Sequence, residues 1–188
     1  PTVSAGVNVA ICTGSGTTLT GSGATTYSWT PAATLSASTG MSVTASPTVA
    51  TTYTVTGTTS GCTSTAVSTV TVTPLPTVLV SSPTICNGQS ANLSASGATS
   101  YTWTGGLAAI SNPTTPVLTT TTTYTVTGTT NGCTGTAVAT VTVKPNPTVT
   151  VNSPSICNNQ TASLSASGAT TYTWTGGLVA ISNPITPA

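Results

Sequence analysis

The chain of 188 residues carries one Lys and no Arg, Asp, Glu or His, so its formal net charge is +1. Charged side chains make up 1 % of the sequence, against roughly a quarter in an ordinary globular domain. General acid–base catalysis, carboxylate-bound metals and phosphate-binding basic surfaces all need such side chains. We therefore expect no enzyme, no catalytic residue, no metal site, no cofactor and no nucleic-acid partner.

The apolar content argues against a disordered chain. Hydrophobic residues make up 37 % of the sequence, whereas disordered chains combine high charge with few apolar residues. No run of about 18 apolar residues predicts a membrane-spanning helix. No signal peptide is visible at Pro1, so any secretion signal is expected outside this sequence.

Three copies of one pattern divide the chain. Each copy begins with Pro-Thr-Val and reaches a cysteine, at Cys12, Cys86 or Cys157, before a Gly-Ala-Thr segment leads to a Tyr-x-Trp pair. Segments 51–72 and 122–143 also match closely, and copies at a fixed period predict a repeat architecture. The expected domains are repeat one at 1–75, repeat two at 76–146 and an incomplete repeat three at 147–188.

The third copy has no counterpart of segment 122–143. A repeat without that segment would lose about half of its core. We expect the chain to be a segment of a longer array, or the missing strands to come from another molecule.

In repeat two, alternation of apolar and polar residues predicts half-buried strands, in chain order at 91–96, 101–103, 123–127 and 137–143. Thr and Ser occupy the outward positions, and aromatic and β-branched residues suit the inward ones. The expected inward residues are Ala91, Leu93, Ala95, Tyr101, Trp103, Tyr124, Val126, Ala137, Ala139, Val141 and Val143. Short strands between Gly- and Asn-containing turns predict an all-β fold, with one β-sandwich in each repeat.

Each repeat resembles an immunoglobulin-like (Ig-like) or PKD-like domain. Segment 122–143 is similar to the last two strands of a PKD-type sandwich. The resemblance implies that Tyr124 is the corner tyrosine and Trp103 the core tryptophan of the third strand. The wider pattern is similar to tandem Ig-like repeats of secreted surface proteins from Bacteroidota, which implies a location at the bacterial cell surface.

Aromatic residues recur at equivalent places in every repeat. Because each Tyr-x-Trp pair shares one face, we expect these side chains to pack in cores rather than to stack on sugar rings. Solvent exposure of Trp103 would instead favour sugar binding. The expected core aromatics are Tyr27, Trp29, Tyr53, Tyr101, Trp103, Tyr124, Tyr172 and Trp174.

Under the same resemblance, the five cysteines predict disulfides within repeats. The expected pairs are Cys12 with Cys62 and Cys86 with Cys133, each tying the loop before the second strand to the final hairpin. Each bridge would close a loop of about 50 residues, for which chain entropy gives about 4 kcal/mol. Cys157 would have its partner outside the chain, with a free buried thiol as the alternative. Paired cysteines indicate an oxidising, extracellular setting.

Short Pro-x-Pro linkers at 74–76 and 145–147 connect the repeats. Proline favours extended, stiff spacers, so we expect a rod in which each repeat contacts its neighbours. Lys144, the only charged side chain, adjoins the second linker. We expect it to be solvated, with contact to a neighbouring chain as the alternative.

Thr and Ser make up about two fifths of the sequence. Ser/Thr-rich chains with Pro are typical of O-glycosylated stalks, and a nearly neutral β protein otherwise tends to associate. We expect glycans on outward hydroxyls and at two Asn-x-Ser/Thr sequons, with an unmodified polar surface as the alternative. The candidate positions are Thr119, Thr120, Thr121, Thr122, Thr123, Thr125, Thr127, Asn92 and Asn159.

The leading functional hypothesis is structural: an extracellular Ig-repeat array that forms a filament, stalk or adhesin shaft. Its partners would be further copies of the repeat or neighbouring chains. The alternative is an adhesive or carbohydrate-binding module that contacts cell-surface glycans. Ice binding through Thr-x-Thr rows is a third class, which a twisted sheet fits poorly.

Overall fold

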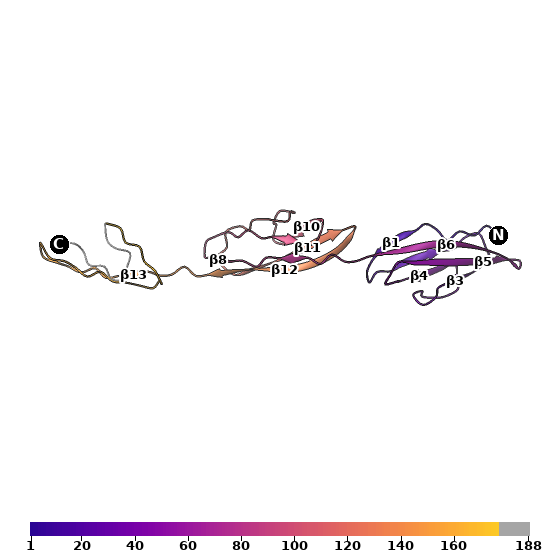
Figure 1. Ribbon diagram of the computed structural model, residues 1–188, viewed down its shortest axis with the longest axis horizontal. Helices are drawn as coiled ribbons and strands as arrows, with labels where there is room; N and C mark the ends of the chain where they lie inside the picture. The colour runs from indigo at the N-terminus through magenta and orange to yellow at the C-terminus, as the bar shows by residue number, and fades with distance from the viewer. Residues whose placement is uncertain (177–188) are drawn as a thin grey trace.

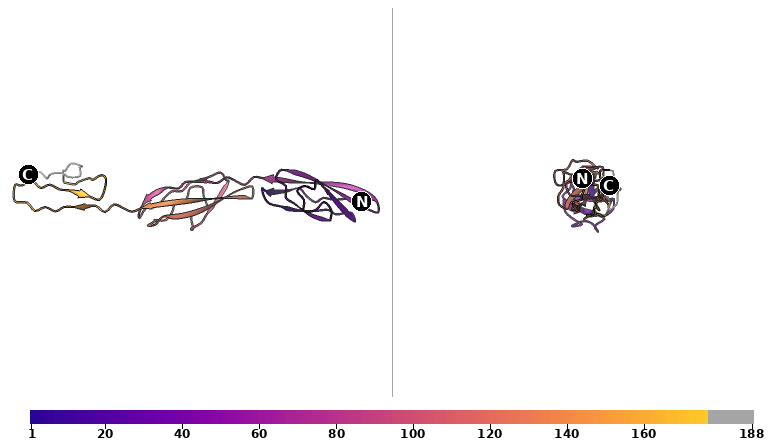
Figure 2. Two further views of the ribbon diagram at one scale, coloured as in Figure 1. Left: turned by 90° about the horizontal axis from the view of Figure 1, so that it is seen from below. Right: turned by 90° about the vertical axis from the view of Figure 1, so that its left-hand side faces the viewer.

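The computed structural model describes residues 1–176, which form strands and turns without a helix. The repeats follow one another along the long axis of the molecule (Figure 1), and a view along that axis shows them superimposed (Figure 2). Because residues 1–176 form no helix, no helical membrane span occurs among them.

Repeat one is a sandwich of two sheets. A four-stranded sheet has the order β1-β6-β5-β3, and β2 pairs with β4 in the second sheet. Strand β1 runs parallel to β6, whereas the other pairs are antiparallel. This order, with the last two long strands between the third strand and the first, is that of an Ig-like sandwich. The strands are β1 (Val9–Cys12), β2 (Thr17–Thr20), β3 (Thr26–Thr30), β4 (Ser42–Ala45), β5 (Thr51–Thr59) and β6 (Cys62–Thr73).

Repeat two has the same arrangement. Its four-stranded sheet has the order β10-β11-β12-β8, with β8 parallel to β12, and β7 pairs with β9 opposite it. The all-β, Ig-like prediction is therefore confirmed. The strands are β7 (Leu79–Val80), β8 (Thr84–Cys86), β9 (Ala95–Ser96), β10 (Ser100–Trp103), β11 (Thr122–Thr130) and β12 (Cys133–Lys144).

The cores consist of the inward residues of both sheets. In β11 and β12, Val126, Ala139 and Val141 are fully buried, whereas Val138, on the other face, is 59 % exposed. The predicted alternation is confirmed in repeat two, since all of the expected inward residues belong to its core cluster or pack against it. Repeat one has its own separate cluster around Trp29, so each sandwich has a core of its own.

Repeat three forms less regular structure, although its sequence matches the other two. Strand β13 (Thr150–Val151) pairs with β14 (Ala166–Ser167), as β7 pairs with β9. Tyr172 and Trp174 are only half-buried and form no strand. Their counterparts in β10 pair with β11, and residues 147–176 contain no segment equivalent to β11. The rest of the third copy, 177–188, lies outside the described residues.

Candidate functional sites: the joint between repeats and the threonine faces

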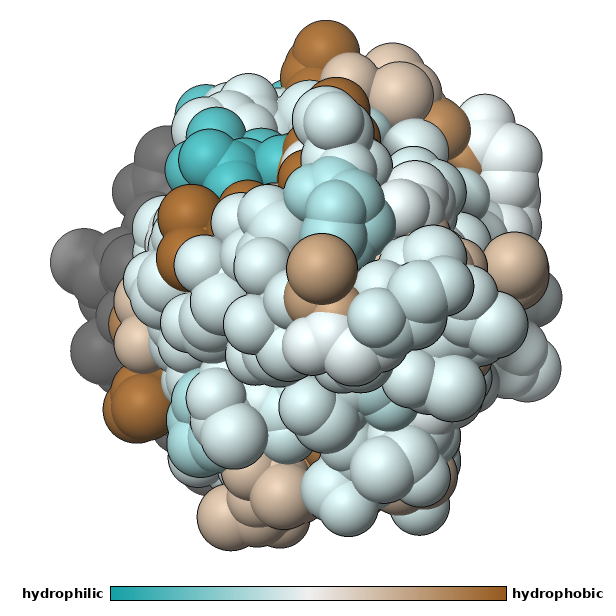
Figure 3. All heavy atoms as spheres, turned by 90° about the vertical axis from the view of Figure 1, so that its right-hand side faces the viewer, coloured by the Kyte–Doolittle hydropathy of each residue, from teal (hydrophilic) through white to brown (hydrophobic). Residues whose placement is uncertain are grey.

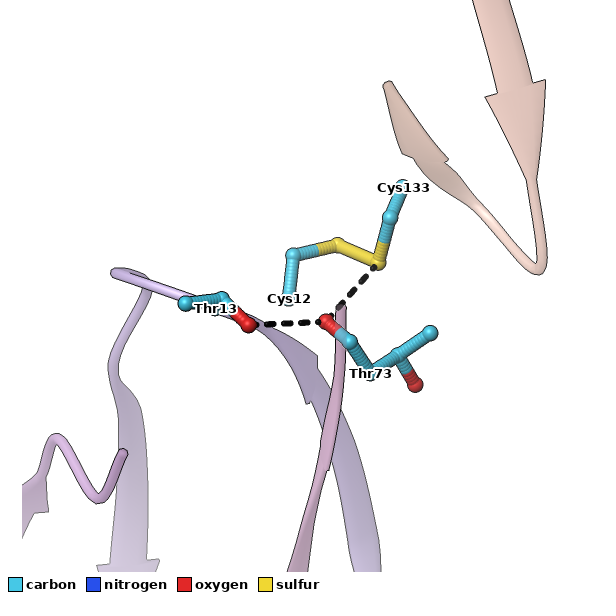
Figure 4. Close-up of a disulfide and its surroundings, with 4 residues drawn as sticks. All are labelled: Cys12, Thr13, Thr73 and Cys133. Carbon is cyan, nitrogen blue, oxygen red and sulfur yellow. Dashed lines mark hydrogen bonds between the residues drawn. A yellow bond between two sulfur atoms is a disulfide. The ribbon is translucent and has the colours of Figure 1, made fainter. Parts of the chain in front are cut away.

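A disulfide joins repeat one to repeat two. The Cα atoms of Cys12 and Cys133 lie 5.6 Å apart, although 121 residues separate them in sequence. Cys12 ends strand β1 and Cys133 begins strand β12, so the bond crosses the joint (Figure 4). The two sandwiches are thus linked twice, by the Pro-x-Pro linker and by this bridge.

The predicted pairs Cys12–Cys62 and Cys86–Cys133 are wrong. Strand β6 runs from Cys62 to Thr73, and Thr73 lies beside Cys12 in the sheet. At roughly 3.3 Å per residue, these ends are about 36 Å apart, whereas disulfide Cα atoms lie within about 7 Å. Strand β12 separates Cys133 from Cys86 in the same way, because Cys86 pairs with Lys144 at the far end.

Backbone contacts support the bridge. The carbonyl of Thr73 accepts hydrogen bonds from the amide of Thr13 at 2.9 Å and from its hydroxyl at 3.2 Å. The Sγ of Cys133 lies 4.0 Å from the same carbonyl (Figure 4). A Cβ added to Gly135 would lie 2.1 Å from the carbonyl oxygen of Pro76. Strand β12 therefore packs directly on the linker, which leaves the joint little freedom.

The cysteines occupy two kinds of position. Cys12, Cys86 and Cys157 each begin a turn, in which the carbonyl accepts a hydrogen bond from the amide three residues later, at 2.9, 3.2 and 3.2 Å. Cys62 and Cys133 each follow a two-residue hairpin turn with positive φ values, which suits Ser-Gly and Asn-Gly. The bond at the joint connects one cysteine of each kind.

The other cysteines are accessible. Cys62, Cys86 and Cys157 are exposed and form no disulfide within the described residues, while Cys133 is 2 % exposed. The alternative of a free buried thiol at Cys157 is wrong, because that residue is exposed. The prediction of a partner for Cys157 outside the chain stays a prediction.

The outward face of each long hairpin is a surface of threonine pairs. In β11–β12 the side chains opposite one another are Thr123–Thr140, Thr125–Val138, Thr127–Thr136 and Thr129–Thr134. Repeat one has the same order, with Val67 in the place of Val138, and the hydroxyls of Thr52 and Thr69 hydrogen-bond at 2.9 Å. Thr–Thr pairs suit a solvated sheet face. These faces are uncharged and rich in hydroxyls.

The glycosylation candidates differ in what their hydroxyls do. Thr119, Thr120 and Thr123 are exposed, and their hydroxyls make no hydrogen bond to other described residues. The hydroxyl of Thr121 accepts a hydrogen bond from the amide of Val143 at 3.1 Å. That of Thr122 donates to the carbonyl of Thr120 at 2.9 Å. A glycan on Thr122 would remove that donor. Thr119, Thr120 and Thr123 are therefore better attachment sites for a sugar.

The remaining candidates are partly constrained. Thr125 and Thr127 are half-buried within the sheet face. Asn92 is exposed, and its Oδ1 accepts a hydrogen bond from the hydroxyl of Thr114 at 2.7 Å. Asn159 is exposed in a turn at a φ of 62°.

The aromatic side chains of the two complete repeats lie in the cores, at 0–9 % exposure. The indole nitrogens of Trp29 and Trp103 donate to the carbonyls of Gly40 at 3.0 Å and Ile110 at 2.9 Å. Trp103 is therefore unavailable to stack on a sugar ring, which removes the main support for a carbohydrate-binding surface.

A tyrosine clamp recurs in all three repeats. The hydroxyl of Tyr101 accepts from the amide of Ala98 at 2.9 Å and donates to its carbonyl at 2.8 Å. Tyr27 and Tyr172 make the same pair of bonds. The repeated Gly-Ala-Thr-x-Tyr spacing was the sequence signal for this clamp, which was missed. Tyr124, the expected corner tyrosine, makes no such bond within the described residues.

The described surface offers little chemistry. It contains no group of three His, Cys, Asp or Glu side chains that could hold a metal ion. A shallow cleft of about 580 Å³ in repeat one is lined mainly by Thr and Ser, with Tyr27 and Met41. The end of the molecule at repeat one carries mostly weakly hydrophilic residues, with hydrophobic residues scattered among them (Figure 3).

No protein-family model and no curated protein matches the chain. Among solved structures, the titin I-band fragment I67–I69 is 11 % identical, with 86 % of this chain and 73 % of that chain covered and a TM-score of 0.41. Three N-terminal domains of the bacteriophage RB49 outer capsid protein Hoc are 19 % identical, with 82 % and 63 % covered and a TM-score of 0.38. The N-terminal eight Ig domains of DSCAM are 13 % identical, with 87 % and 31 % covered and a TM-score of 0.38. The Ig-like assignment rests on the strand order described above.

Proposed function

We propose that the chain is a structural segment of an extracellular rod, which serves as a filament, a stalk or the shaft of an adhesin. The observation that carries this proposal is the bond between Cys12 and Cys133. A disulfide that joins consecutive sandwiches transmits tension from one repeat to the next, so the linker does not carry the whole load. A bridge within one repeat would have no such effect.

Three further observations support this role. Strand β12 packs on the Pro-x-Pro linker through Gly135, which restricts bending at the joint. A disulfide fits an oxidising compartment, and the resemblance of the repeats favours a bacterial cell surface. The chain also has no carboxylate or imidazole that a catalytic site would use. Its partners would be further repeats of this kind or neighbouring chains in a fibre.

Microscopy of the native material tests the structural role. Negative-stain images should show regular fibres with a width of one repeat, or of a few repeats packed laterally. Isolated compact particles would contradict the proposal.

We also propose that the threonine faces carry O-linked glycans. Exposed hydroxyls that make no hydrogen bond among the described residues occur at Thr119, Thr120 and Thr123, and the nearly neutral surface has little charge to keep fibres apart. The intact mass of the natively produced 188-residue segment should exceed the 18.2 kDa of its polypeptide. Peptide mapping should place the sugars at 119–123. A mass equal to the bare polypeptide would reject this part.

A further inference from the structure

The second joint contains an open cleft. It lies between repeats two and three and has a volume of about 870 Å³. Proline residues of the linker form one side, and the Gly-Ala-Thr loop of repeat three forms the other. The lining residues are Lys144, Pro145, Pro147, Gly168, Ala169, Thr170 and Thr171.

At the first joint, the equivalent residues contact a β-hairpin. Thr99, the counterpart of Thr170, donates to the carbonyl of Thr129 through its amide at 3.1 Å and through its hydroxyl at 2.6 Å. A Cβ on Gly128 would lie 2.7 Å from the Cβ of Ala98, the counterpart of Ala169. The walls of the second cleft thus match the surface on which the β11–β12 hairpin lies at the first joint.

Cys86 lies at this second joint as Cys12 lies at the first. Cys86 pairs with Lys144 across parallel strands, and Cys12 pairs with Thr73 in the same way. The next residue, Asn87, donates its amide to the carbonyl of Lys144 at 2.8 Å, which repeats the 2.9 Å bond from Thr13 to Thr73. Cys86 is exposed and unbonded among the described residues, whereas Cys12 is bonded to Cys133.

We infer that the cleft is the docking site for a β-hairpin of the Thr-Thr-Asn-Gly-Cys type that completes repeat three, and that Cys86 forms a disulfide with the cysteine of that hairpin. The inference rests on the proposed structural role and deepens it, because it makes the inter-repeat bridge a feature of every joint. Cys62, the hairpin counterpart of Cys133, is then the cysteine that bonds to a turn cysteine of another repeat.

The bond forms by thiol–disulfide exchange with a protein or low-molecular-weight disulfide, such as oxidised glutathione. The thiolate of one cysteine attacks the oxidant and displaces a thiolate, which leaves a mixed disulfide. The second cysteine then attacks the mixed disulfide and displaces the other thiolate. Two protein thiols are oxidised, the oxidant disulfide is reduced to two thiols, and one sulfur–sulfur bond has been exchanged for another.

An extended chain tests the inference. A copy of residues 118–146 appended after Ala188 continues the third repeat in register and places its cysteine 71 residues beyond Cys133. The protein is refolded in a glutathione redox buffer, and its disulfides are mapped by mass spectrometry without reduction. The control is the same extension with its cysteine replaced by serine. Because Trp29 and Trp103 are already buried, a change in tryptophan fluorescence on extension reports whether Trp174, half-buried in the unextended chain, becomes fully buried.

The expected result is a bond between Cys86 and the appended cysteine, with Cys86 no longer reacting with a maleimide. In the serine control Cys86 should react, Trp174 should still become buried, and Cys12–Cys133 should persist. Two results would overturn the inference: a free Cys86 beside a buried Trp174, or an extension that leaves Trp174 unchanged. Missing fibres in micrographs would reject the proposed function without affecting this bond, so the two failures are distinguishable.

Discussion

Cys12 and Cys133 belong to different sandwiches, yet their Cα atoms are 5.6 Å apart and their sulfurs are bonded. The joint is therefore covalent on two sides, through the linker and through the bridge. The two hydrophobic cores stay separate. Each repeat has its own core, and the bridge limits how far one repeat can move relative to the next.

Loss of the bridge should destabilise the chain far more than loss of an exposed cysteine. We expect Cys133→Ser to lower the free energy of unfolding by about 5 kcal/mol, because the unfolded chain loses a crosslink across 121 residues. The matched control is Cys62→Ser, at the equivalent hairpin position but exposed, with an expected change below about 0.5 kcal/mol. Chemical denaturation followed by tryptophan fluorescence measures both. Equal effects would contradict the assigned bond.

The tyrosine clamp should contribute measurably to stability. Tyr101→Phe removes the two hydrogen bonds to the backbone of Ala98 and should cost about 2 kcal/mol, since each such bond contributes about 1 kcal/mol. Tyr124→Phe serves as the control, because its buried ring remains and no described hydrogen bond is lost; its expected cost is below about 0.5 kcal/mol. Thermal unfolding of the two variants distinguishes them, and a neutral Tyr101→Phe would show that the clamp is not stabilising.

Gly97 should be far less replaceable than Gly88. Both have positive φ values, +94° and +85°, but a Cβ on Gly97 would lie 2.0 Å from the carbonyl oxygen of Thr77 whereas one on Gly88 meets nothing. We expect Gly97→Ala to cost about 3 kcal/mol, from backbone strain and overpacking together. Gly88→Ala should cost about 1 kcal/mol from strain alone. Similar unfolding midpoints for the two variants would refute the close approach of Thr77.

Stability should be almost independent of pH. The side chains include no carboxyl and no imidazole, so folded and unfolded states bind equal numbers of protons between about pH 5 and about pH 7. The slope of the unfolding free energy with pH, proportional to that difference, is then zero. Denaturation curves across this range should overlay, with or without added salt. A stability that changes steadily with pH would contradict this expectation.

Local patterns in the sequence predicted the strands at 101–103, 123–127 and 137–143 and the buried faces of repeat two, whereas only Ala95–Ser96 of the predicted strand 91–96 forms one. They succeeded because the alternation that places Val126 inward and Val138 outward depends only on neighbouring residues. Cysteine pairing depends instead on which ends of the sandwiches meet. The distances in sequence from Cys12 to Cys62 and to Cys133 differ by one period of 71 residues, so the repeat pattern is compatible with either partner. The lengths of β6 and β12 were the missing information.

The third repeat shows that a close sequence match does not by itself predict a strand. Its Gly-Ala-Thr-Thr-Tyr-Thr-Trp segment is nearly identical to that of repeat two and keeps the clamp at Tyr172. It nevertheless forms no strand at 171–174, since a strand needs a neighbour to accept and donate its hydrogen bonds. Sequence identity of a segment therefore predicted its local turn and clamp but not its place in a sheet.

Disulfide mapping of this chain, oxidised and unreduced, tests the central claim most directly. Because the sequence has one Lys and no Arg, elastase or pepsin replaces trypsin in the digestion. A peptide containing Cys12 should be linked to a peptide containing Cys133, while Cys62, Cys86 and Cys157 are recovered alkylated. Recovery of Cys12 linked to Cys62, or of Cys86 linked to Cys133, would contradict a rod whose repeats are bonded to one another.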